Sequence, residues 1–322
     1  MNRREVLAAA IAAGVAPYAF AQGAFPNKPI RLVVPFPPGG GTDQASRLIA
    51  QNMTTVLGWN IVVDNKPGAG GNIGIDFVAK SAPDGYTIGM GQASNLAINP
   101  SLYAKMPFDP LKDLTPIVAI SEQPVVLVVR ADSPYKTLGD FIKDAKAKPG
   151  TLGVAQAGNG TVGHLAGELL ERQTGAKIMQ VPYKGAGPAM TELLGGQVPT
   201  YFGSSPSVMS QLAGGKIRAL AVTSAKRLGS MSSVPTVAEQ GYPSFAATTW
   251  LGLVGPAGMP ADVVNRISAE VLKLLARPDL KEKLAADGSE VTPGTPQQFA
   301  AHIKAEHAKW GALIKEANIK LE

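Results

Sequence analysis

Residues 30–57 read IRLVVPFPPGGGTDQASRLIAQNMTTVL. The first five residues are mainly apolar and β-branched, which predicts a short strand at 30–34. Apolar residues at helical spacing predict a helix over 46–57. A strand, a glycine-rich turn and a helix in this order form the opening unit of a layered α/β fold.

The same alternation continues along the chain. The segment 124–130 (PVVLVVR) is continuously apolar, which is typical of a strand buried on both faces. We therefore predict the α/β class, with mainly parallel sheets flanked by helices. The expected strands are 60–64, 86–90, 124–130, 153–157, 178–181, 200–203, 219–223 and 250–254, and the expected helices are 73–80, 138–147, 162–174, 188–194, 208–213, 262–275, 278–287 and 296–318.

Chain length and pattern both predict two lobes. With 322 residues the chain exceeds the size at which one hydrophobic core usually stops growing. The strand–loop–helix unit of 30–57 has a counterpart at 151–174, although the two halves share no sequence repeat. We expect residues 22–122 to form the first part of lobe 1, 123–246 to form lobe 2, and 247–322 to return to lobe 1.

The N-terminus has the three parts of a secretory signal peptide. Arg3 and Arg4 precede the apolar run 6–16, and Ala19-Phe20-Ala21 supplies small residues for cleavage. We expect residues 1–21 to be removed after Ala21 and the protein to reside in the periplasm. The arginine pair leaves both the general and the twin-arginine export routes open.

Composition excludes several classes of function. The chain has no cysteine, which excludes disulfides, thiolate metal sites and cysteine nucleophiles. Its formal charge of +6 comes from scattered residues, without the basic runs of a nucleic-acid site. Neither an HExxH motif nor a GxGxxG or Walker pattern is present. We therefore expect no metal, no cofactor and no nucleic-acid partner.

The glycine-rich loop is the first candidate binding segment. Consecutive glycines let the backbone approach a ligand closely. The free N–H groups at the start of the following helix, together with the helix dipole, favour an anion such as a carboxylate. The alternative is a tight strand-to-helix turn that binds nothing. The candidate residues here are Phe36, Gly39, Gly40, Gly41, Thr42 and Asp43.

A second loop of small residues precedes the helix predicted at 162–174, and polar residues also follow other strands. Because ligands of open α/β sheets lie beyond the carboxyl ends of the strands, these segments are expected to line one pocket. The candidates are Gly158, Asn159, Gly160, Thr161 and His164 in the second loop and helix, with Ser94, Asn95, Tyr183, Ser204 and Ser205 at other strand ends.

His164 is the one candidate that suggests catalysis. A hydrolase would need a cleft serine beside His164 and an orienting acid such as Glu168. Ser204 and Ser205 lack the GxSxG context of a nucleophile. A structural role for His164 is the favoured interpretation, so no catalytic residue is predicted.

Several long motifs resemble the Bug-type receptors, the extracytoplasmic binding subunits of tripartite tricarboxylate transporters. The resemblance runs in order over essentially the whole mature chain. Its motifs are PFPPGGGTD at 35–43, NKPGAGGNIG at 65–74, APDGYT at 82–87, AGNGT at 157–161 with HLAGE at 164–168, VPYKG at 181–185, LGGQV at 194–198 and VPTVAE at 234–239.

The resemblance implies a type II-like Venus-flytrap fold, whose lobes close on a small carboxylate, and a role as a non-enzymatic receptor for membrane transporter subunits. It implies that Phe36 to Thr42 hold one carboxylate through backbone amides, that 158–161 close over it, and that 203–205 meet the distal end. Many relatives carry an acid where Ser204 stands, so we expect a di- or tricarboxylate or an aromatic acid without an amine. We expect a monomer, and a ligand-presenting sensor is the alternative function.

Overall fold

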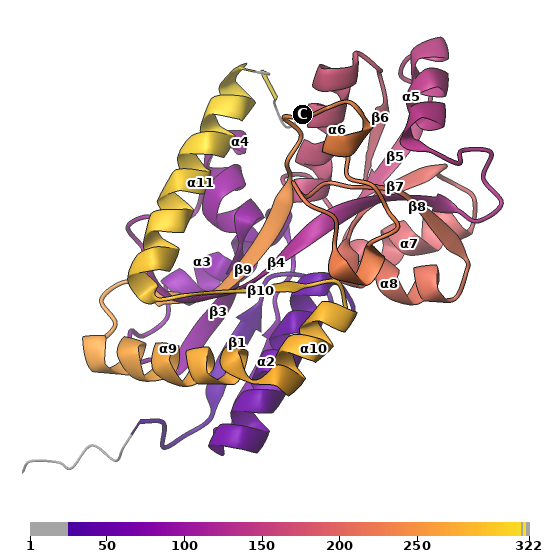
Figure 1. Cartoon of the computed structure of the whole chain (residues 1–322). Helices are drawn as coiled ribbons and strands as arrows, with labels where there is room; N and C mark the ends of the chain where they lie inside the picture. The colour runs from indigo at the N-terminus through magenta and orange to yellow at the C-terminus, as the bar shows by residue number, and fades with distance from the viewer. Residues whose placement is uncertain (1–24, 317, 320–322) are drawn as a thin grey trace, which may run out of the picture.

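The computed structural model describes residues 25–316 and 318–319. The chain forms two α/β halves joined by long strands that run from one half into the other (Figure 1). This arrangement confirms the expected α/β class and two-lobed shape. The predicted signal peptide and its cleavage site at Ala21 lie outside the described residues.

The first half is built on a parallel sheet. Strand β1 (Ile30–Val34) lies between β2 (Ile61–Asn65) and β3 (Thr87–Gln92). Helices α2 (Gly41–Leu57) and α3 (Asn72–Ala79) connect these strands. Every residue of β1 except its arginine is fully buried, which is why an apolar, β-branched run forms this central strand. The helix α2 begins at residue 41 rather than 46, because its first turn includes the last residue of the glycine run.

The second half repeats this plan. Strand β5 (Gly153–Gln156) lies between β6 (Met179–Pro182) and β7 (Thr200–Ser204), and all three are parallel. Helix α6 (Val162–Thr174) follows β5, and α7 (Ala186–Leu194) follows β6. The half also contains α5 (Leu138–Ala147), α8 (Ser205–Ala213), β8 (Ile217–Val222), and the short helices η3 (Gly229–Met231) and η4 (Ala238–Gln240).

Two strands pass between the halves, and here the structure departs from the prediction of mainly parallel sheets. Strand β4 (Leu114–Arg130) pairs antiparallel with β9 (Thr248–Pro256) in its first part and with β7 and β8 in its second. The parallel arrangement is confined to the strands built around β1 and β5. The crossing strands are antiparallel because they carry the chain into the second half and back again.

The partners of β4 change between Pro124 and Val125, and β9 begins at Thr248. The lobe boundaries expected near residues 123 and 247 remain a prediction, and these strands are the segments about which the lobes would move. The sequence pattern predicted only the second part of β4. Its first part contains Pro116, Ser121 and Glu122, which interrupt the apolar pattern.

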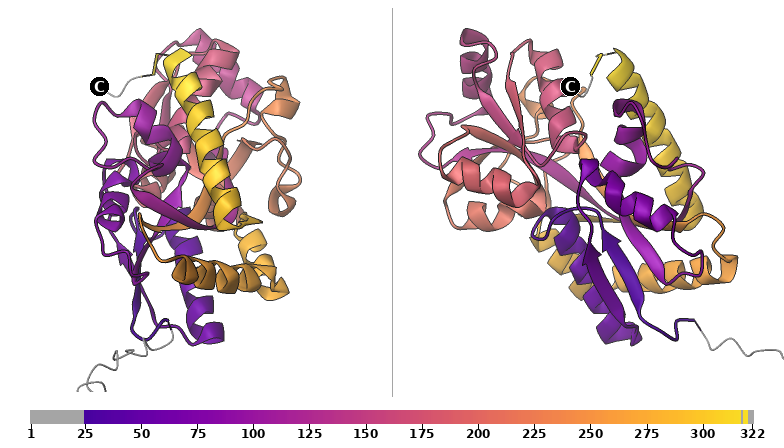
Figure 2. Two further views of the ribbon diagram at one scale, coloured as in Figure 1. Left: turned by 90° about the vertical axis from the view of Figure 1, so that its left-hand side faces the viewer. Right: turned by 180° about the vertical axis from the view of Figure 1, so that it is seen from behind.

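The C-terminal helices cover the first half and reach the second. Helix α11 (Pro296–Glu316) contacts β4 and runs toward α6, where Arg172 Nη2 lies 3.4 Å from Glu316 Oε2 (Figures 1 and 2). The buried side chains Phe299 and Trp310 anchor it. The other elements are η1 (Ala69–Gly71), η2 (Ser94–Ile98), α4 (Asn99–Leu102), α9 (Ala261–Ala276), α10 (Pro278–Ala286) and β10 (Glu290–Gly294), which pairs with β4.

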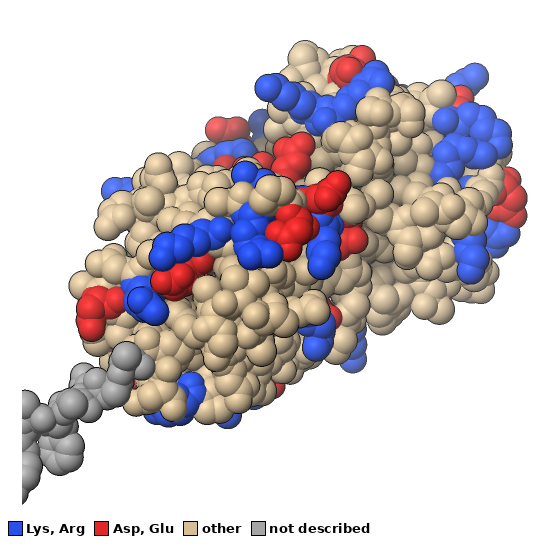
Figure 3. Space-filling model, turned by 60° about the horizontal axis from the view of Figure 1, so that its bottom comes forward, with Lys and Arg blue, Asp and Glu red and all other residues tan. Residues whose placement is uncertain are grey.

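Charged side chains of both signs are interspersed on the surface. On the face shown in Figure 3, basic and acidic side chains lie next to one another, without one continuous basic region. Surface ion pairs such as Arg277–Asp279 and Lys273–Glu270 occur among the described residues. Among residues 25–316, we find no helix with the length and hydropathy needed to cross a membrane.

Candidate functional site

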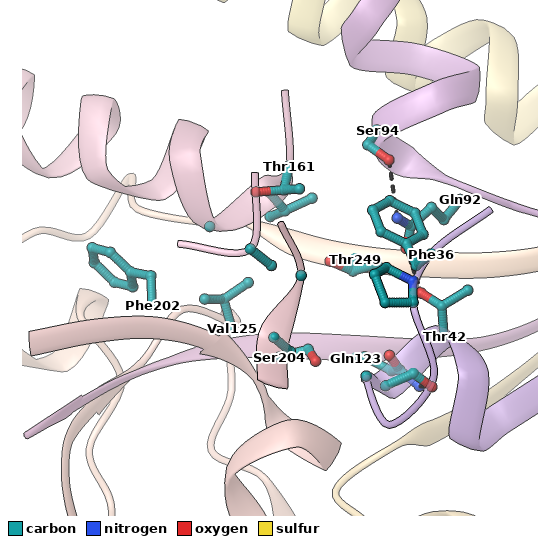
Figure 4. A pocket seen from close by; sticks show the side chains of 18 of the residues that line it. Phe36, Thr42, Gln92, Ser94, Gln123, Val125, Thr161, Phe202, Ser204 and Thr249 are labelled. Atoms are coloured by element: carbon teal, nitrogen blue, oxygen red, sulfur yellow. Dashed lines mark hydrogen bonds between the residues drawn. The ribbon is translucent and has the colours of Figure 1, made fainter. Parts of the chain in front are cut away.

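A cavity lies between the two halves, at the carboxyl ends of β1, β5, β6 and β7 (Figure 4). Its volume is about 60 Å³, which corresponds to several water molecules at roughly 10–15 Å³ each. We call it the interlobe pocket. Its lining residues are Phe36, Pro37, Gly40, Gly41, Thr42, Gln92, Ser94, Gln123, Val125, Ala157, Thr161, Val162, Gly163, Gly185, Ala186, Tyr201, Phe202, Ser204 and Thr249.

The glycine-rich loop presents the start of α2 to the pocket. The first helical hydrogen bond is donated by Gln44 N–H to Gly40 O at 3.0 Å. The preceding N–H groups of Gly41 and Thr42 have no acceptor among the described residues, and both residues line the pocket. These groups are the unsatisfied donors expected at a helix start, where an anion is favoured.

Asp43 holds this loop from behind and does not line the pocket. Its Oδ2 atom accepts from Gly39 N–H at 3.0 Å and from Arg47 Nε at 2.9 Å, while its Oδ1 accepts from Asn65 Nδ2 at 2.9 Å. Burial opposes ionisation of Asp43, but these hydrogen bonds outweigh it and hold the pKa of the carboxyl below its ordinary value. Asp43 is therefore a loop-positioning carboxylate.

The second loop folds back on itself and presents the start of α6. Thr161 Oγ1 donates to Gly158 O at 2.7 Å, and Gly158 N–H donates to Gln156 Oε1 at 2.7 Å. The pocket is lined by Thr161, Val162 and Gly163, and Gly158 to Gly160 lie outside its lining. As in the first loop, the helix start rather than the glycine tip faces the pocket.

Two further helices of the second half begin at the same pocket. The N-cap of α7 is Gly185, and the N-cap of α8 is Ser204; both line the cavity. Four helix N-termini, those of α2, α6, α7 and α8, therefore converge on one space. No lysine, arginine, histidine or acidic side chain is among the lining residues. The electrostatic character of the pocket is thus set by helix dipoles and amide groups, which favour a negative ligand.

A short chain of hydrogen bonds orients the polar side chains of the first half. Thr42 Oγ1 donates to Gln92 Oε1 at 2.9 Å, and Gln92 Nε2 donates to Ser94 Oγ at 3.0 Å (Figure 4). The oxygen of Ser94 accepts in this arrangement, so its hydroxyl hydrogen remains available to donate to a ligand. Gln92 thereby positions two hydroxyl groups at the pocket.

The structure brings together part of the predicted ligand-binding set. Phe36, Gly40, Gly41, Thr42, Ser94, Thr161 and Ser204 all line the interlobe pocket. The other predicted residues lie behind or beside it: Gly39, Asp43, Asn95, Gly158, Asn159, Gly160, His164, Tyr183 and Ser205. That any of them contacts a ligand remains a prediction.

Ser205 illustrates why neighbours in the sequence diverge. Its Oγ atom is fully buried and donates to Gly288 O of the first half at 2.6 Å. Ser204, one residue earlier, faces the pocket (Figure 4). Asn95 lies outside the lining as well: its Oδ1 accepts from Gln92 N–H at 3.1 Å, while its Nδ2 is buried and has no partner among the described residues.

His164 is buried in the second half, and the hydrolase alternative has no support in its surroundings. Its Nδ1 atom accepts from Gly160 N–H at 3.4 Å, and its Nε2 lies 3.7 Å from Glu168 Oε1. No serine or threonine hydroxyl is hydrogen-bonded to the ring among the described residues. Burial lowers the pKa of His164 to about 4, so the ring is neutral near pH 7.

Several lining residues were missed by the sequence interpretation. Gln92 ends β3, and Gln123 lies within β4 where the chain passes between the halves. A glutamine inside an otherwise apolar strand was the signal that could have found Gln123. The remaining missed residues are Val125, Val162, Gly163, Ala186, Tyr201, Phe202 and Thr249.

Comparison with known proteins agrees with this architecture. The family model described as tripartite tricarboxylate transporter family receptor matches residues 45–319. The periplasmic binding protein BugD is 34% identical, with a TM-score of 0.87, covering 92% of this chain and 100% of BugD.

Two similar structures contain ligands. An R. palustris protein with adipate is 36% identical, with a TM-score of 0.89, covering 92% of this chain and 99% of that one. MatC from Rhodopseudomonas palustris, with bound malate, is 33% identical, with a TM-score of 0.85, covering 90% of this chain and 100% of MatC.

Proposed function

The chain belongs to the tripartite tricarboxylate transporter receptor family, whose members are solute-binding receptors rather than enzymes, and we propose that it captures a small carboxylate in the periplasm and delivers it to the membrane subunits of such a transporter. The observation that carries this proposal is the convergence of four helix N-termini on a pocket without charged side chains.

A carboxylate suits this pocket for an electrostatic reason. Each helix start carries a partial positive charge and free N–H donors, so the four together attract an anion. A cation would meet the same field without an acidic side chain to offset it. The absence of an acid at Ser204 therefore supports the prediction that the ligand has no amine.

The lining also suits a ligand with an apolar body between polar ends. Donors lie on both sides: Gly41 and Thr42 in the first half, and Val162 and Gly163 in the second. Apolar side chains such as Val125 and Phe36 also line the pocket. A dicarboxylate or an aromatic acid fits this pattern, and adipate and malate in the two similar structures are consistent with the first of these.

A screen of organic acids tests the proposal. Succinate, adipate and benzoate would each be added to the purified mature protein in a thermal-unfolding assay, with aspartate and glutamate as amine-bearing controls. At a hundredfold excess over Kd a ligand stabilises by about 2.7 kcal/mol, which raises Tm by roughly 4 °C for a chain of this length. Stabilisation by the amino acids and by none of the plain acids would contradict the proposed ligand class.

Closure of the lobes is part of the proposal, and Gly160 tests it. A Cβ atom at Gly160 would overlap Asn99 Oδ1 of the first half and lie 3.3 Å from the ring of Tyr103. Gly160→Ala should therefore disfavour the closed form and weaken ligand affinity by about tenfold, because a ligand that bridges the lobes binds closed protein preferentially.

The matched control is Gly175→Ala in the same half. Gly175 has φ +70°, close to the +78° of Gly160, but an added Cβ would meet no atom within 4 Å. Both alanines therefore carry a similar backbone strain, and only Gly160 faces the other half. Calorimetry of an acid that stabilises the wild type should show weaker binding in Gly160→Ala alone. An equal change in both variants would show that backbone strain, not lobe contact, is responsible.

The expected periplasmic location and monomeric state belong to the same proposal. Mass spectrometry of the exported protein should find Gln22 at its N-terminus if the signal peptide is cleaved after Ala21. Light scattering should give the mass of one chain with and without ligand.

A further inference from the structure

Gln123 has an amide group whose orientation is determined by its neighbours. Its Nε2 atom donates to Gly41 O at 3.1 Å and to Ser289 Oγ at 3.1 Å. A backbone carbonyl can only accept a hydrogen bond, so the nitrogen rather than the oxygen of the amide must face Gly41. Both hydrogens of the amide nitrogen are used within the protein.

The oxygen of the same amide has no donor. Gln123 Oε1 is buried and has no hydrogen-bond partner among the described residues, and Gln123 is only 1% exposed. The residue lines the interlobe pocket beside Ser204 (Figure 4). Because a buried acceptor without a donor costs about 1–3 kcal/mol, a ligand group that donates to Oε1 would remove this cost.

The chemistry of the pocket decides which kind of donor this is. An ammonium group or a protonated carboxyl could also donate to Oε1. The four helix N-termini disfavour a positive charge, and they favour the ionised form of a carboxyl over its protonated form. A neutral hydroxyl group is the donor that remains compatible with this field.

The position of the acceptor decides where that hydroxyl lies on the ligand. A Cβ atom at Gly41 would lie 2.6 Å from Gln123 Oε1, so the oxygen lies against the first residue of α2. The free N–H groups proposed to hold the carboxylate belong to Gly41 and Thr42, the first two residues of the same helix. We infer that the preferred ligand is a hydroxy acid whose hydroxyl is on the carbon next to the bound carboxylate. Gln123 Oε1 accepts a hydrogen bond from this hydroxyl. This inference rests on the proposed carboxylate function.

Matched acid pairs test the inference by calorimetry. Malate and succinate differ only in one 2-hydroxyl group, and so do 3-phenyllactate and 3-phenylpropionate. In the wild type at least one hydroxy acid should bind about tenfold or more tightly than its partner, as expected for a buried acceptor that gains a donor. Both enantiomers of each hydroxy acid would be used.

Two variants separate specificity from structure. Gln123→Met removes Oε1 at similar volume and should reduce the affinity ratio of the pair to about 1–2. Ser289→Ala removes another partner of the amide but keeps Oε1, so its affinity ratio should match that of the wild type. A purely structural role for Gln123 would instead weaken both acids equally and leave the ratio unchanged.

Three other results of the binding experiments would overturn the inference. Equal affinities within both pairs in the wild type would overturn the hydroxyl preference while leaving the carboxylate function intact, and would mean that water supplies the donor to Oε1. Binding of aspartate more tightly than malate would overturn the assignment of a neutral donor. Failure of all four acids to bind, while adipate or benzoate stabilises the protein in the thermal-unfolding screen, would overturn the hydroxyl preference and leave the carboxylate function intact; failure of every acid in both assays would contradict the carboxylate function itself.

Discussion

Replacing Gly41 with alanine is expected to weaken ligand binding by roughly 5- to 150-fold, because overpacking of a well-packed site costs about 1–3 kcal/mol. The added Cβ would lie 2.6 Å from Gln123 Oε1 and 2.8 Å from Ser204 Oγ. Gln123 cannot move away without breaking its hydrogen bonds to Gly41 O and Ser289 Oγ. Ser204 belongs to the other half, so the lobes would also be held further apart.

The neighbouring glycine is the control for this prediction. A Cβ at Gly40 would lie 3.7 Å from Ala186 Cβ, which is an ordinary contact. Calorimetry with an acid from the screen should show wild-type affinity for Gly40→Ala. Opening of the ligand-free protein can relieve the contact with Ser204 but not the contact with Gln123, so the thermal stability of ligand-free Gly41→Ala should fall below that of the wild type. Wild-type affinity in Gly41→Ala would mean that the ligand does not require this close approach.

The parts of the molecule that could be predicted from the sequence are those with a strong local pattern. The first strand and the helix over 162–174 have the expected bounds, because apolar spacing and a threonine N-cap define them locally. The start of β4 and the π-type turn η2 at 94–98 could not be predicted in this way. Their backbone conformation depends on pairing with segments far along the chain.

The same distinction applies to the site. The glycine-rich loop was found because glycine, strand and helix are adjacent in the sequence. Which residues of each loop face the pocket was not predictable, because hydrogen bonds within the loops decide it: Asp43 is turned toward Gly39, and Thr161 toward Gly158. Gln123 reaches the pocket because it lies where β4 leaves its pairing with β9 in one half and begins to pair with β7 in the other.

Acidification is expected to destabilise the protein through His164. Burial lowers the pKa of this histidine from 6.5 to about 4, so the folded protein keeps the ring neutral where the unfolded chain binds a proton. Between these two values the unfolded state holds more protons, and the free energy of unfolding therefore falls as the pH falls. The stabilisation is fully present above pH 6.5, and a shift of this size corresponds to roughly 3 kcal/mol lost by about pH 4.

Two acids also contribute to the pH dependence of stability, but Glu168 acts in the opposite direction to His164 and Asp43 acts at lower pH. Burial raises the pKa of Glu168, so protonation of its carboxyl favours the folded state as the pH falls and partly offsets the loss from His164. The lowered pKa of Asp43 makes its contribution disappear only below the ordinary value of 3.8. A comparison of two proteins that differ at His164 alone removes both contributions.

His164→Gln provides that comparison. Glutamine cannot titrate, and its side-chain oxygen can accept from Gly160 N–H in place of Nδ1. Urea unfolding at about pH 7 and about pH 4.5 should show a loss of stability in the wild type that is smaller in the variant by roughly 2–3 kcal/mol. If both proteins lost the same stability over this interval, the ring of His164 would be free to protonate in the folded state, and the close burial of α6 against the second loop would be incorrect.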